Sequence, residues 1–399
     1  MTDFDAIIVG GGLVGASLAV GLAWRGQRVA VIEAVERSAD HQPSYDDRTL
    51  VINAASLNIL DNLGLLPEDL TRKPIRHIHI SRAGGLGHLE LNAADYEQDQ
   101  FGAVIVAREL GNVLLEAMAN RPGIQSFCPA RLQGFKVESD RVEITLEDGH
   151  SLSAALLVGA DGNHSRVREL AGLACQKHDY RQSAMIFNVQ PQHAPAHTAW
   201  ERFTTQGPLA LLPQSEGRLG VVWIEQSERI EHALNWSDQA LCERLKTRFG
   251  GSLGDFSNPG RRSHYPLVCQ RTPWPVADRL VVIGNAANAV HPVSAQGFNL
   301  GLRDVGGLID ALEETADPGD PDVLNDYARA RQADQESTVR YTDTLARAFT
   351  NPSLVASLAS GLGLAAHAGI PGLSRRLVRS AMGFREPVCT LARQPRVST

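Results

Sequence analysis

The stretch DAIIVGGGLVGASLAVGLAWRGQRVAVIEA, residues 5–34, carries the strongest fold signal in the chain. Its first residues, Asp5–Val9, are apolar and β-branched, as in a buried parallel strand. A helical pattern follows, and Gly26 fits the position just after the end of a helix. A second strand then ends at Glu33. This order of strand, helix and strand predicts an α/β fold that opens with a Rossmann-type domain.

Three glycines between the first strand and the helix give the spacing G-x-G-x-x-G. Gly10 permits a tight turn, Gly12 lets a pyrophosphate approach the backbone, and Gly15 lets the helix pack closely on the strand. The N-terminus of the helix offers free N–H groups to an anion. Glu33 stands where a carboxylate accepts hydrogen bonds from ribose, and it would repel a 2′-phosphate. The stretch therefore predicts FAD or NAD; a glycine-rich turn without a ligand is the alternative.

Two later stretches also pass from a strand into small residues. In ALLVGADGNHSRVREL, residues 155–170, a central strand is broken by Asp161-Gly162, and Ser165 is suited to cap a helix. Taken alone, this is a common β-turn-α connection. GNAANAVHPVSAQGFNLGLRDV, residues 284–305, follows the apolar RLVVI. Either this is a plain tight loop, or a flat or phosphorylated ligand lies against its backbone.

Composition excludes several other classes of protein. The 399 residues are 43% hydrophobic and 21% charged, and the net charge of −7 argues against a nucleic-acid partner. The five cysteines form no CxxC pair, and the 13 histidines form no HExxH motif or other close cluster, so no metal is expected. We find no signal peptide and no apolar run long enough to span a bilayer, and expect a cytoplasmic protein.

Together the three stretches resemble the p-hydroxybenzoate-hydroxylase-like FAD mono-oxygenases. That family carries the dinucleotide fingerprint, a middle D-G motif and a late G-D motif, which fall here at Gly10–Gly15, Asp161-Gly162 and Gly284-Asn285. The resemblance implies that the middle motif lies by the pyrophosphate and that the late motif holds the ribityl chain. The run after it would line the isoalloxazine ring. It implies these cofactor-binding residues: Gly10, Gly12, Gly15, Glu33, Arg48, Arg108, Asp161, Gly162, Gly284, Asn285, Pro292, Gln296, Gly297 and Asn299.

Two positions depart from the family pattern. Asn285 replaces an Asp, so a ribityl hydroxyl would lose the stronger charge-assisted bond, and Ala295 replaces the commoner Gly. We expect the cofactor edge to lie against the backbone at three small residues, Ala286, Ala287 and Gly297.

The resemblance also implies a reaction. A C4a-hydroperoxide of the flavin would pass one oxygen atom of O₂ to a phenol, and NAD(P)H would reduce the flavin while bound transiently. The stretches 201–213, 235–250 and 260–267 are similar to hydroxylases of the ubiquinone ring, which implies a polyprenylated phenol as substrate. Alternatives are another ring position, a small soluble phenol, an NAD-dependent dehydrogenase, or a non-enzymatic scaffold in a biosynthetic complex.

Two residues are candidates for chemistry. Arg48 matches an arginine that the family places near the flavin, although it could instead pair with Asp46 or Asp47. His291 could stabilise an anionic flavin or phenolate, or merely pack. Arg108 either contacts FAD or is a solvated charge at a helix start. Four further residues line either the substrate pocket or the core of a sheet: Tyr180, Asn188, Phe203 and Trp223.

The motif positions predict discontinuous domains. We expect an FAD-binding domain at 1–75, 100–180 and 276–345, and an α+β substrate domain at 76–99 and 181–275 with hairpins at 77–92 and 208–226. An amphipathic helical stretch begins near residue 325, and a C-terminal helical region covers 346–399.

The C-terminal region contains an apolar, glycine-rich stretch with Arg375, Arg376 and Arg379. It is either a membrane-surface element where the polyprenyl chain enters, or a set of helices packed on the cofactor domain or on a second copy of the chain. The expected partners are therefore the phenol, O₂, a membrane surface and a ubiquinone-biosynthesis complex.

Overall fold

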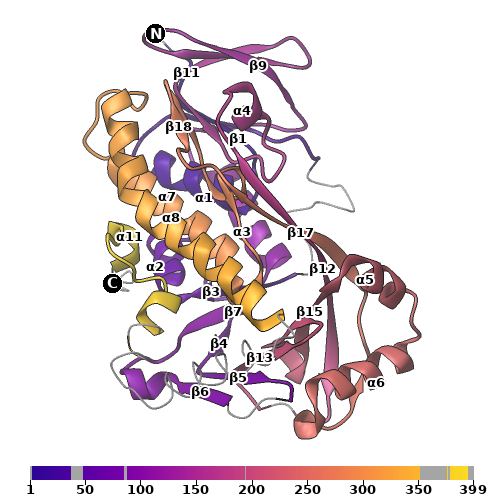
Figure 1. Ribbon diagram of the computed structural model, residues 1–399. Coiled ribbons are helices and arrows are strands. Elements are labelled where there is room, and N and C mark those ends of the chain that lie inside the picture. Colours follow the sequence, from indigo (N-terminus) through magenta and orange to yellow (C-terminus); the bar gives the residue numbers. More distant parts are fainter. Residues whose placement is uncertain are drawn as a thin grey trace.

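The computed structural model describes residues 2–36, 48–84, 88–193, 195–350, 375 and 378–393, and describes side chains in the long helix only up to residue 347. Within these ranges the chain forms three sheets with helices around them (Figure 1). The fold is mixed α/β, as predicted.

An eight-stranded sheet contains the Rossmann-type core. Strands β19, β11, β1, β2 and β8 run parallel in that order. Val9 at the end of β1 pairs with Ile32 of β2 and Gly159 of β11, and Gly159 pairs with Val282 of β19, so four strands end in one row. The strands of this sheet are β1 (Phe4–Val9), β2 (Val29–Ile32), β8 (Ile124–Phe127), β9 (Leu132–Val137), β10 (Val142–Leu146), β11 (Ser151–Gly159), β18 (Val276–Ala277) and β19 (Leu280–Val282).

Helices cover this parallel sheet because its strands are apolar on both faces. α1 (Leu13–Trp24) and α7 (Gln296–Ala311) contribute to one large apolar cluster with α2 (Ala54–Asn62) and α3 (Ala107–Asn120). Gly26 has φ +82° directly after the cap of α1, which confirms the predicted helix end. The small sheet beside these helices contains β3 (Thr49–Asn53), β4 (Lys73–Ile75) and β7 (Gly102–Val106).

A nine-stranded, mostly antiparallel sheet forms the second half of the molecule. Both predicted hairpins are confirmed, since β5 pairs with β6 and β14 pairs with β15. The long strands β12 and β17 run from the parallel sheet into this one (Figure 1). Its strands are β5 (His77–Arg82), β6 (His88–Asn92), β12 (Gln176–Pro191), β13 (Thr198–Thr204), β14 (Gly207–Pro213), β15 (Leu219–Gln226), β16 (Phe256–Ser257), β17 (Ser263–Arg271) and β20 (Asn288–Ala289).

The two faces of the antiparallel sheet have different neighbours. α5 (Ser227–Leu234) and α6 (Asp238–Phe249) pack on one face through a cluster that includes Trp200 and Trp223. The opposite face packs on the cofactor half, where Phe203 and Val293 share a cluster. The predicted domain bounds stay predictions; β20, at 288–289, joins this sheet although it lies in the range assigned to the FAD-binding domain.

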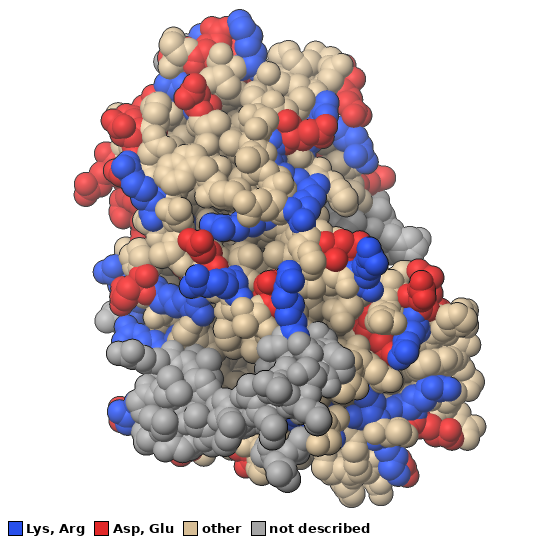
Figure 2. All heavy atoms as spheres, viewed as in Figure 1, with Lys and Arg blue, Asp and Glu red and all other residues tan. Residues whose placement is uncertain are grey.

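One long helix, α8 (Pro321–Thr350), crosses the molecule and packs on α7 (Figure 1), so the predicted amphipathic stretch is helical. The described part of the chain ends with α11 (Thr390–Arg393), and the short α4 (Arg166–Leu170) follows the Asp161-Gly162 turn. Basic and acidic side chains are interspersed on the face seen in Figure 2. Among the described residues, no helix combines the length and the apolar character that crossing a bilayer requires. Most of the glycine-rich C-terminal stretch lies outside the described residues.

Candidate cofactor and substrate site

Three bends follow strands of the parallel sheet and meet at one of its edges: the first at Gly10–Gly15, the second at Asp161-Gly162 and the third at Gly284-Asn285. Gly10, with φ +105°, follows β1, and a Cβ atom on it would overlap the carbonyl of Ala160, which follows β11. A Cβ atom on Gly15 would overlap the carbonyl oxygen of Gly10. A Cβ atom on Gly284 would lie 3.1 Å from Val14 at the start of α1. The first bend therefore touches both of the others.

The start of α1 is open to an anion. Gly12 is its N-cap, and neither a capping side chain nor an acidic residue occupies its first turn. Glu33 lies beside this turn, where its two oxygens accept hydrogen bonds from the N–H of Gly11 at 2.7 Å and of Val35 at 2.8 Å. The carboxylate is thus fixed at the end of β2, at the position predicted for a ribose partner.

The second bend is held by Asp161. Its Oδ2 accepts hydrogen bonds from the N–H groups of Arg166, at 2.6 Å, and Val167, at 3.2 Å, while Ser165 caps α4 as predicted. Oδ1 of Asp161 is buried with no hydrogen-bond partner in the described part of the chain. Gly162 has φ +79°. Asp161 therefore acts as a helix cap that keeps one acceptor for a ligand.

Arg168 joins the second and third bends, a role that was not predicted from the sequence. Its guanidinium is buried and donates to the carbonyl oxygens of Ala286, at 2.6 Å, and Asn163, at 2.9 Å. An arginine in a short helix carries no local sign of this role. Ala286 and Ala287 are fully buried in an apolar cluster. This corrects the expectation that they lie against the cofactor, because their small size serves core packing.

The third bend continues into a strained loop. Gly284 has φ +57° and Asn285 is exposed, while Ser294 and Ala295 adopt left-handed φ angles of +63° and +49°. Such angles cost free energy for residues with a Cβ atom, and they occur most often at functional sites. Pro292 and Gly297 flank these strained positions, and a Cβ atom on Gly297 would have only Val290 nearby, at 3.7 Å.

Two polar residues predicted to bind the cofactor also make side-chain contacts that hold this loop. Gln296 donates to the carbonyl of Ser294 at 3.2 Å. The amide of Asn299 donates to the carbonyls of Val51 and Ala295, and its oxygen accepts from the N–H of Asn53. The side-chain N–H₂ and C=O groups of Asn299 are thus both hydrogen-bonded to protein, and they join α7 to β3.

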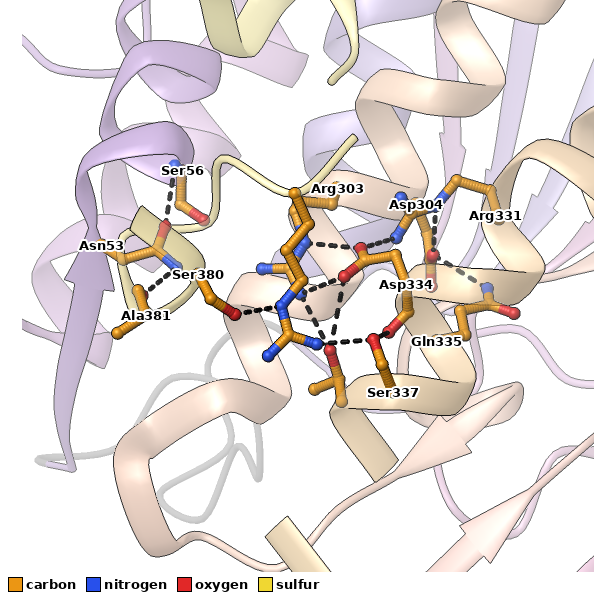
Figure 3. A network of polar contacts seen from close by, with 12 residues as sticks. Asn53, Ser56, Arg303, Asp304, Arg331, Asp334, Gln335, Ser337, Ser380 and Ala381 are labelled. Atoms are coloured by element: carbon orange, nitrogen blue, oxygen red, sulfur yellow. Dashed lines mark hydrogen bonds and ion pairs between the residues drawn. The ribbon is translucent and has the colours of Figure 1, made fainter. Parts of the chain in front are cut away.

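A buried ionic network lies behind the third bend (Figure 3). Asp304 accepts from the N–H of Gly284 at 3.4 Å and from Nε of Arg331 at 3.0 Å. Arg331 also bonds Asp334, which Arg303 contacts at 2.7 Å. Burial alone would raise the pKa of Asp334, but Arg303 and Arg331 outweigh it and hold that pKa well below the ordinary value. The bend is therefore tied to α8 through charged side chains.

Arg48 lies where the cofactor half meets the antiparallel sheet, beside residues of β12 and β17. The Arg48 guanidinium lies 5.0 Å from the ring centre of Tyr265, and its side chain borders a cavity of about 40 Å³ with Asn188. The backbone carbonyl of Arg48 accepts a hydrogen bond from the N–H of Ala107. Arg108 is the next residue after Ala107, and its side chain is exposed. Asp46 and Asp47 lie outside the described residues.

His291 is a neutral donor in the interior. It is 1% exposed, and its Nδ1 accepts from the N–H of Val293 at 3.2 Å, which assigns the proton to Nε2. That Nε2 has no partner in the described part of the chain. Burial lowers the pKa of His291 to about 4, against a smaller opposing effect of Asp343. The Tyr180 ring contacts His291 edge-on at 4.9 Å.

The other residues predicted to line the substrate pocket, Asn188, Phe203 and Trp223, do not all lie on one face of the antiparallel sheet. Asn188 accepts from Arg218 at 2.7 Å beside the Arg48 cavity. Phe203 points toward the loop with Val293, whereas Trp223 packs with α5 and α6 on the opposite face. Glu201, which was not predicted as a site residue, lies on the same face as Phe203, two residues away in β13.

One cluster of possible metal ligands forms only in the folded chain. The β5–β6 hairpin brings ligand atoms of His79, His88 and Glu90 within 4.8 Å of one another. The sequence shows no such cluster because the three residues come from two strands. They lie on the same face of the sheet as Trp200, away from the strained loop.

The geometry of this edge fits FAD. An elongated diphosphate ligand needs an uncapped helix start, close backbone approach and a carboxylate at the ribose, and all of these meet where the strands end. The buried, unpaired Oδ1 of Asp161 and Nε2 of His291 offer an acceptor and a donor on the bends themselves.

Comparisons with known proteins agree with this fit. A family model described as an FAD binding domain matches residues 3–342. The chain is 35% identical over 386 residues to ubiquinone hydroxylase UbiL of Rhodospirillum rubrum, covering 95% of this chain and 89% of that protein. It is 32% identical to 3-demethoxyubiquinol 3-hydroxylase of Escherichia coli, covering 95% of this chain and 98% of that protein.

The fold is also found in solved structures. PqsL, a probable FAD-dependent monooxygenase from Pseudomonas aeruginosa, superposes with a TM-score of 0.74 at 22% identity, covering 87% of this chain and 97% of that chain. At this level of identity the likeness concerns the fold.

Proposed function

The chain belongs to the FAD-binding-domain family and is an FAD-dependent mono-oxygenase, and from that premise we propose that it hydroxylates a polyprenylated phenol of ubiquinone biosynthesis. The observation that carries the proposal is the similarity over 95% of the chain to proteins named as ubiquinone hydroxylases. The stretches 201–213, 235–250 and 260–267 resemble 2-octaprenyl-6-methoxyphenol hydroxylase, and we propose this phenol as the substrate.

The residues of the site have separate tasks in this reaction. Bound FAD, reduced by NAD(P)H, would supply the activation of O₂. The start of α1 would hold the pyrophosphate and Glu33 the ribose. The loop from Pro292 to Gly297 would lie beside the isoalloxazine ring, with the antiparallel sheet excluding water from above. The sequence has one complete Rossmann fingerprint, so we propose that NAD(P)H binds only transiently.

Deletion of the gene tests the substrate. We expect the mass spectrum of the deletion strain to show accumulation of 2-octaprenyl-6-methoxyphenol. The purified protein, supplied with NAD(P)H and ¹⁸O₂, should transfer one labelled oxygen atom to that phenol. Product formed without O₂, in the presence of an artificial electron acceptor, would rule out oxygen insertion.

A second candidate is hydroxylation at another position of the ring. It is favoured by the 32% identity to an enzyme named 3-demethoxyubiquinol 3-hydroxylase. The same deletion experiment separates the two, because a later, demethoxylated precursor would accumulate instead.

We also propose contact with a membrane surface, since a polyprenyl chain partitions into lipid. The stretch that would make this contact lies largely outside the described residues, but Arg375 and Arg379 are both exposed. Co-sedimentation with anionic vesicles, compared with neutral vesicles, tests this proposal.

A further inference from the structure

The register of the antiparallel sheet places one carboxylic acid in an otherwise apolar row. Ile80 of β5 pairs with Glu201 of β13, which pairs with Ala210 of β14; the row continues through Val222 of β15 to Ile186 of β12. All five are partly exposed inside a sheet whose neighbouring positions are mostly buried. Because alternate residues of a strand point to opposite faces, this row lies on a single face.

That face is the one turned toward the cofactor half. In β13, Ala199 and Phe203 flank Glu201 on the same side and belong to the cluster that contains Val293, while Trp200 belongs to the cluster of α5 and α6. Glu201 must therefore point toward the loop proposed to lie beside the flavin.

The loop itself meets Glu201. The backbone N–H of Ser294 lies close enough to the Glu201 carboxyl to act on its pKa, which it lowers. Ser294 has φ +63°, so the chain adopts a left-handed angle at the residue that supplies this N–H. The pKa of Tyr341, in α8, is raised mainly by burial; the Ser294 side chain lowers it and the charge of Glu201 raises it, so the three side chains lie close together. Among the described residues, Ser294 and Tyr341 are the polar groups that face the carboxyl, and Arg385 acts on Tyr341.

Burial sets the protonation range of this carboxyl. Protein atoms closely surround the Glu201 carboxyl, although the residue as a whole is only partly buried. Burial raises the pKa of Glu201 to about 7, and the Ser294 N–H opposes this rise only partly. A carboxyl with such a pKa can both accept and release a proton near neutral pH, as general acid–base catalysis requires.

We propose that Glu201 is the general base of the reaction, accepting the proton of the substrate's phenol hydroxyl while the apolar row of Ile80, Ala210, Val222 and Ile186 receives the apolar part of the substrate. The proposal rests on the phenol hydroxylation proposed above. The O–H bond of the phenol breaks, its proton bonds to a carboxylate oxygen of Glu201, and the electron pair stays on the phenolate. The ring carbon thereby becomes the better nucleophile toward the electrophilic oxygen. The proton later returns to solvent.

Glu201→Gln tests this role, because it keeps an acceptor for the Ser294 N–H but cannot take up a proton. We expect FAD content and flavin reduction by NAD(P)H to stay as in the wild type. Hydroxylation of the phenol should fall about 100-fold or more, and its rise with pH near 7 should disappear. A fluorinated phenol with the same tail, ionised without help at pH 7, should recover at least about tenfold of the loss.

A matched control and a second measurement separate chemistry from folding. Glu90→Gln changes a carboxylate of the same sheet on the opposite face and should leave the pH profile unchanged. In the flavin-free protein, the stability of the wild type relative to Glu201→Gln should fall as pH rises from 4.5 to about 7, because folded Glu201 retains a proton that the unfolded state has released.

The outcomes are distinct. Wild-type rate and pH profile in Glu201→Gln, or the absence of rescue by the fluorinated phenol, would overturn the role of Glu201 and leave the proposed function intact. A wild-type protein that reduces its flavin but hydroxylates no phenol would overturn the proposed function, and this inference with it.

Discussion

The edge of the parallel sheet and the inner face of the antiparallel sheet build the site in opposite ways. At the edge, the groups proposed to face the ligand are backbone N–H groups and closely spaced residues around Gly10–Gly15 and Asp161-Gly162. On the face, Glu201 meets Ser294 and Tyr341, which come from distant parts of the chain. A site made of backbone bends leaves a local pattern in the sequence, whereas a site made of side chains on a sheet depends on register.

The largest effect is expected at the edge. Glu33→Lys removes the ribose acceptor and the acceptor of two backbone N–H groups, and it places a positive charge beside the bend. Hydrogen bonds to charged groups contribute about 1.5–3 kcal/mol each, so we expect FAD affinity to fall at least about 100-fold. The flavin absorbance of the purified protein measures this.

Glu36→Lys serves as the control, because it makes the same change at an exposed position near the same strand end. It should retain flavin. A Glu33→Lys protein that purified with full flavin would mean that the end of β2 does not contact the cofactor.

The buried ionic network behind the third bend gives the next effect. Its Asp304 accepts a hydrogen bond from the N–H of Gly284, so loss of the network should loosen that bend. Arg331→Met leaves Asp304 and Asp334 short of a buried partner. Removing one partner of a buried ion pair typically costs about 3–5 kcal/mol, and we expect that loss in the free energy of unfolding measured with urea.

Arg329→Met is the matched control, since Arg329 lies in the same helix and pairs only at the surface with Asp326. It should change stability by no more than about 0.5 kcal/mol. Equal effects of the two variants would show that the network does not hold the bend in place.

His291 gives the next effect, and its sign follows from its lowered pKa. Unfolded His291 binds a proton below pH 6.5, whereas folded His291 does so only near pH 4. The contribution of His291 to stability is therefore complete above pH 6.5 and is lost as pH falls between these values, opposite in sign to the contribution of Glu201. The shift from 6.5 to about 4 corresponds to about 3 kcal/mol at about 1.36 kcal/mol per unit.

His291→Gln should therefore flatten the loss of stability between pH 6.5 and 4, as measured by thermal unfolding. His150→Gln changes an exposed histidine and should leave that slope as it is. An unchanged slope in His291→Gln would mean that His291 is protonated as readily in the folded state as in the unfolded one.

The same contrast explains how much could be predicted from the sequence. The strand before Gly10, the cap at Ser165 and both hairpins follow from local patterns of apolar residues, glycines and caps, and all are present. The convergence of the bends also follows, because parallel strands end at one edge of a sheet.

The remainder depends on contacts between distant parts of the chain. Arg168 has no local signature of its bond to Ala286, and Ala286 looks like a ligand-facing residue until its burial is known. The bonds of the Asn299 side chain to Val51 and Asn53 join segments far apart in the sequence, and no spacing rule could indicate them. Glu201 differs from a surface glutamate only through the strands paired on both sides of it.

The smallest effect concerns the strained loop where the two halves of the site meet. Ala295 has φ +49°, which costs a residue with a Cβ atom about 1–2 kcal/mol relative to its preferred angles. Ala295→Gly relieves this cost, but glycine also gains about 0.4–1 kcal/mol of freedom in the unfolded chain. The net expectation is a stabilisation of up to about 1 kcal/mol in urea unfolding.

Ala330→Gly, at an exposed position in α8, is the control and should instead destabilise the protein by about 1 kcal/mol. A loss of stability in both variants would mean that the loop gains more from its alanine side chain than the left-handed angle costs, and the strain would then lie at Ser294, the residue whose N–H meets Glu201.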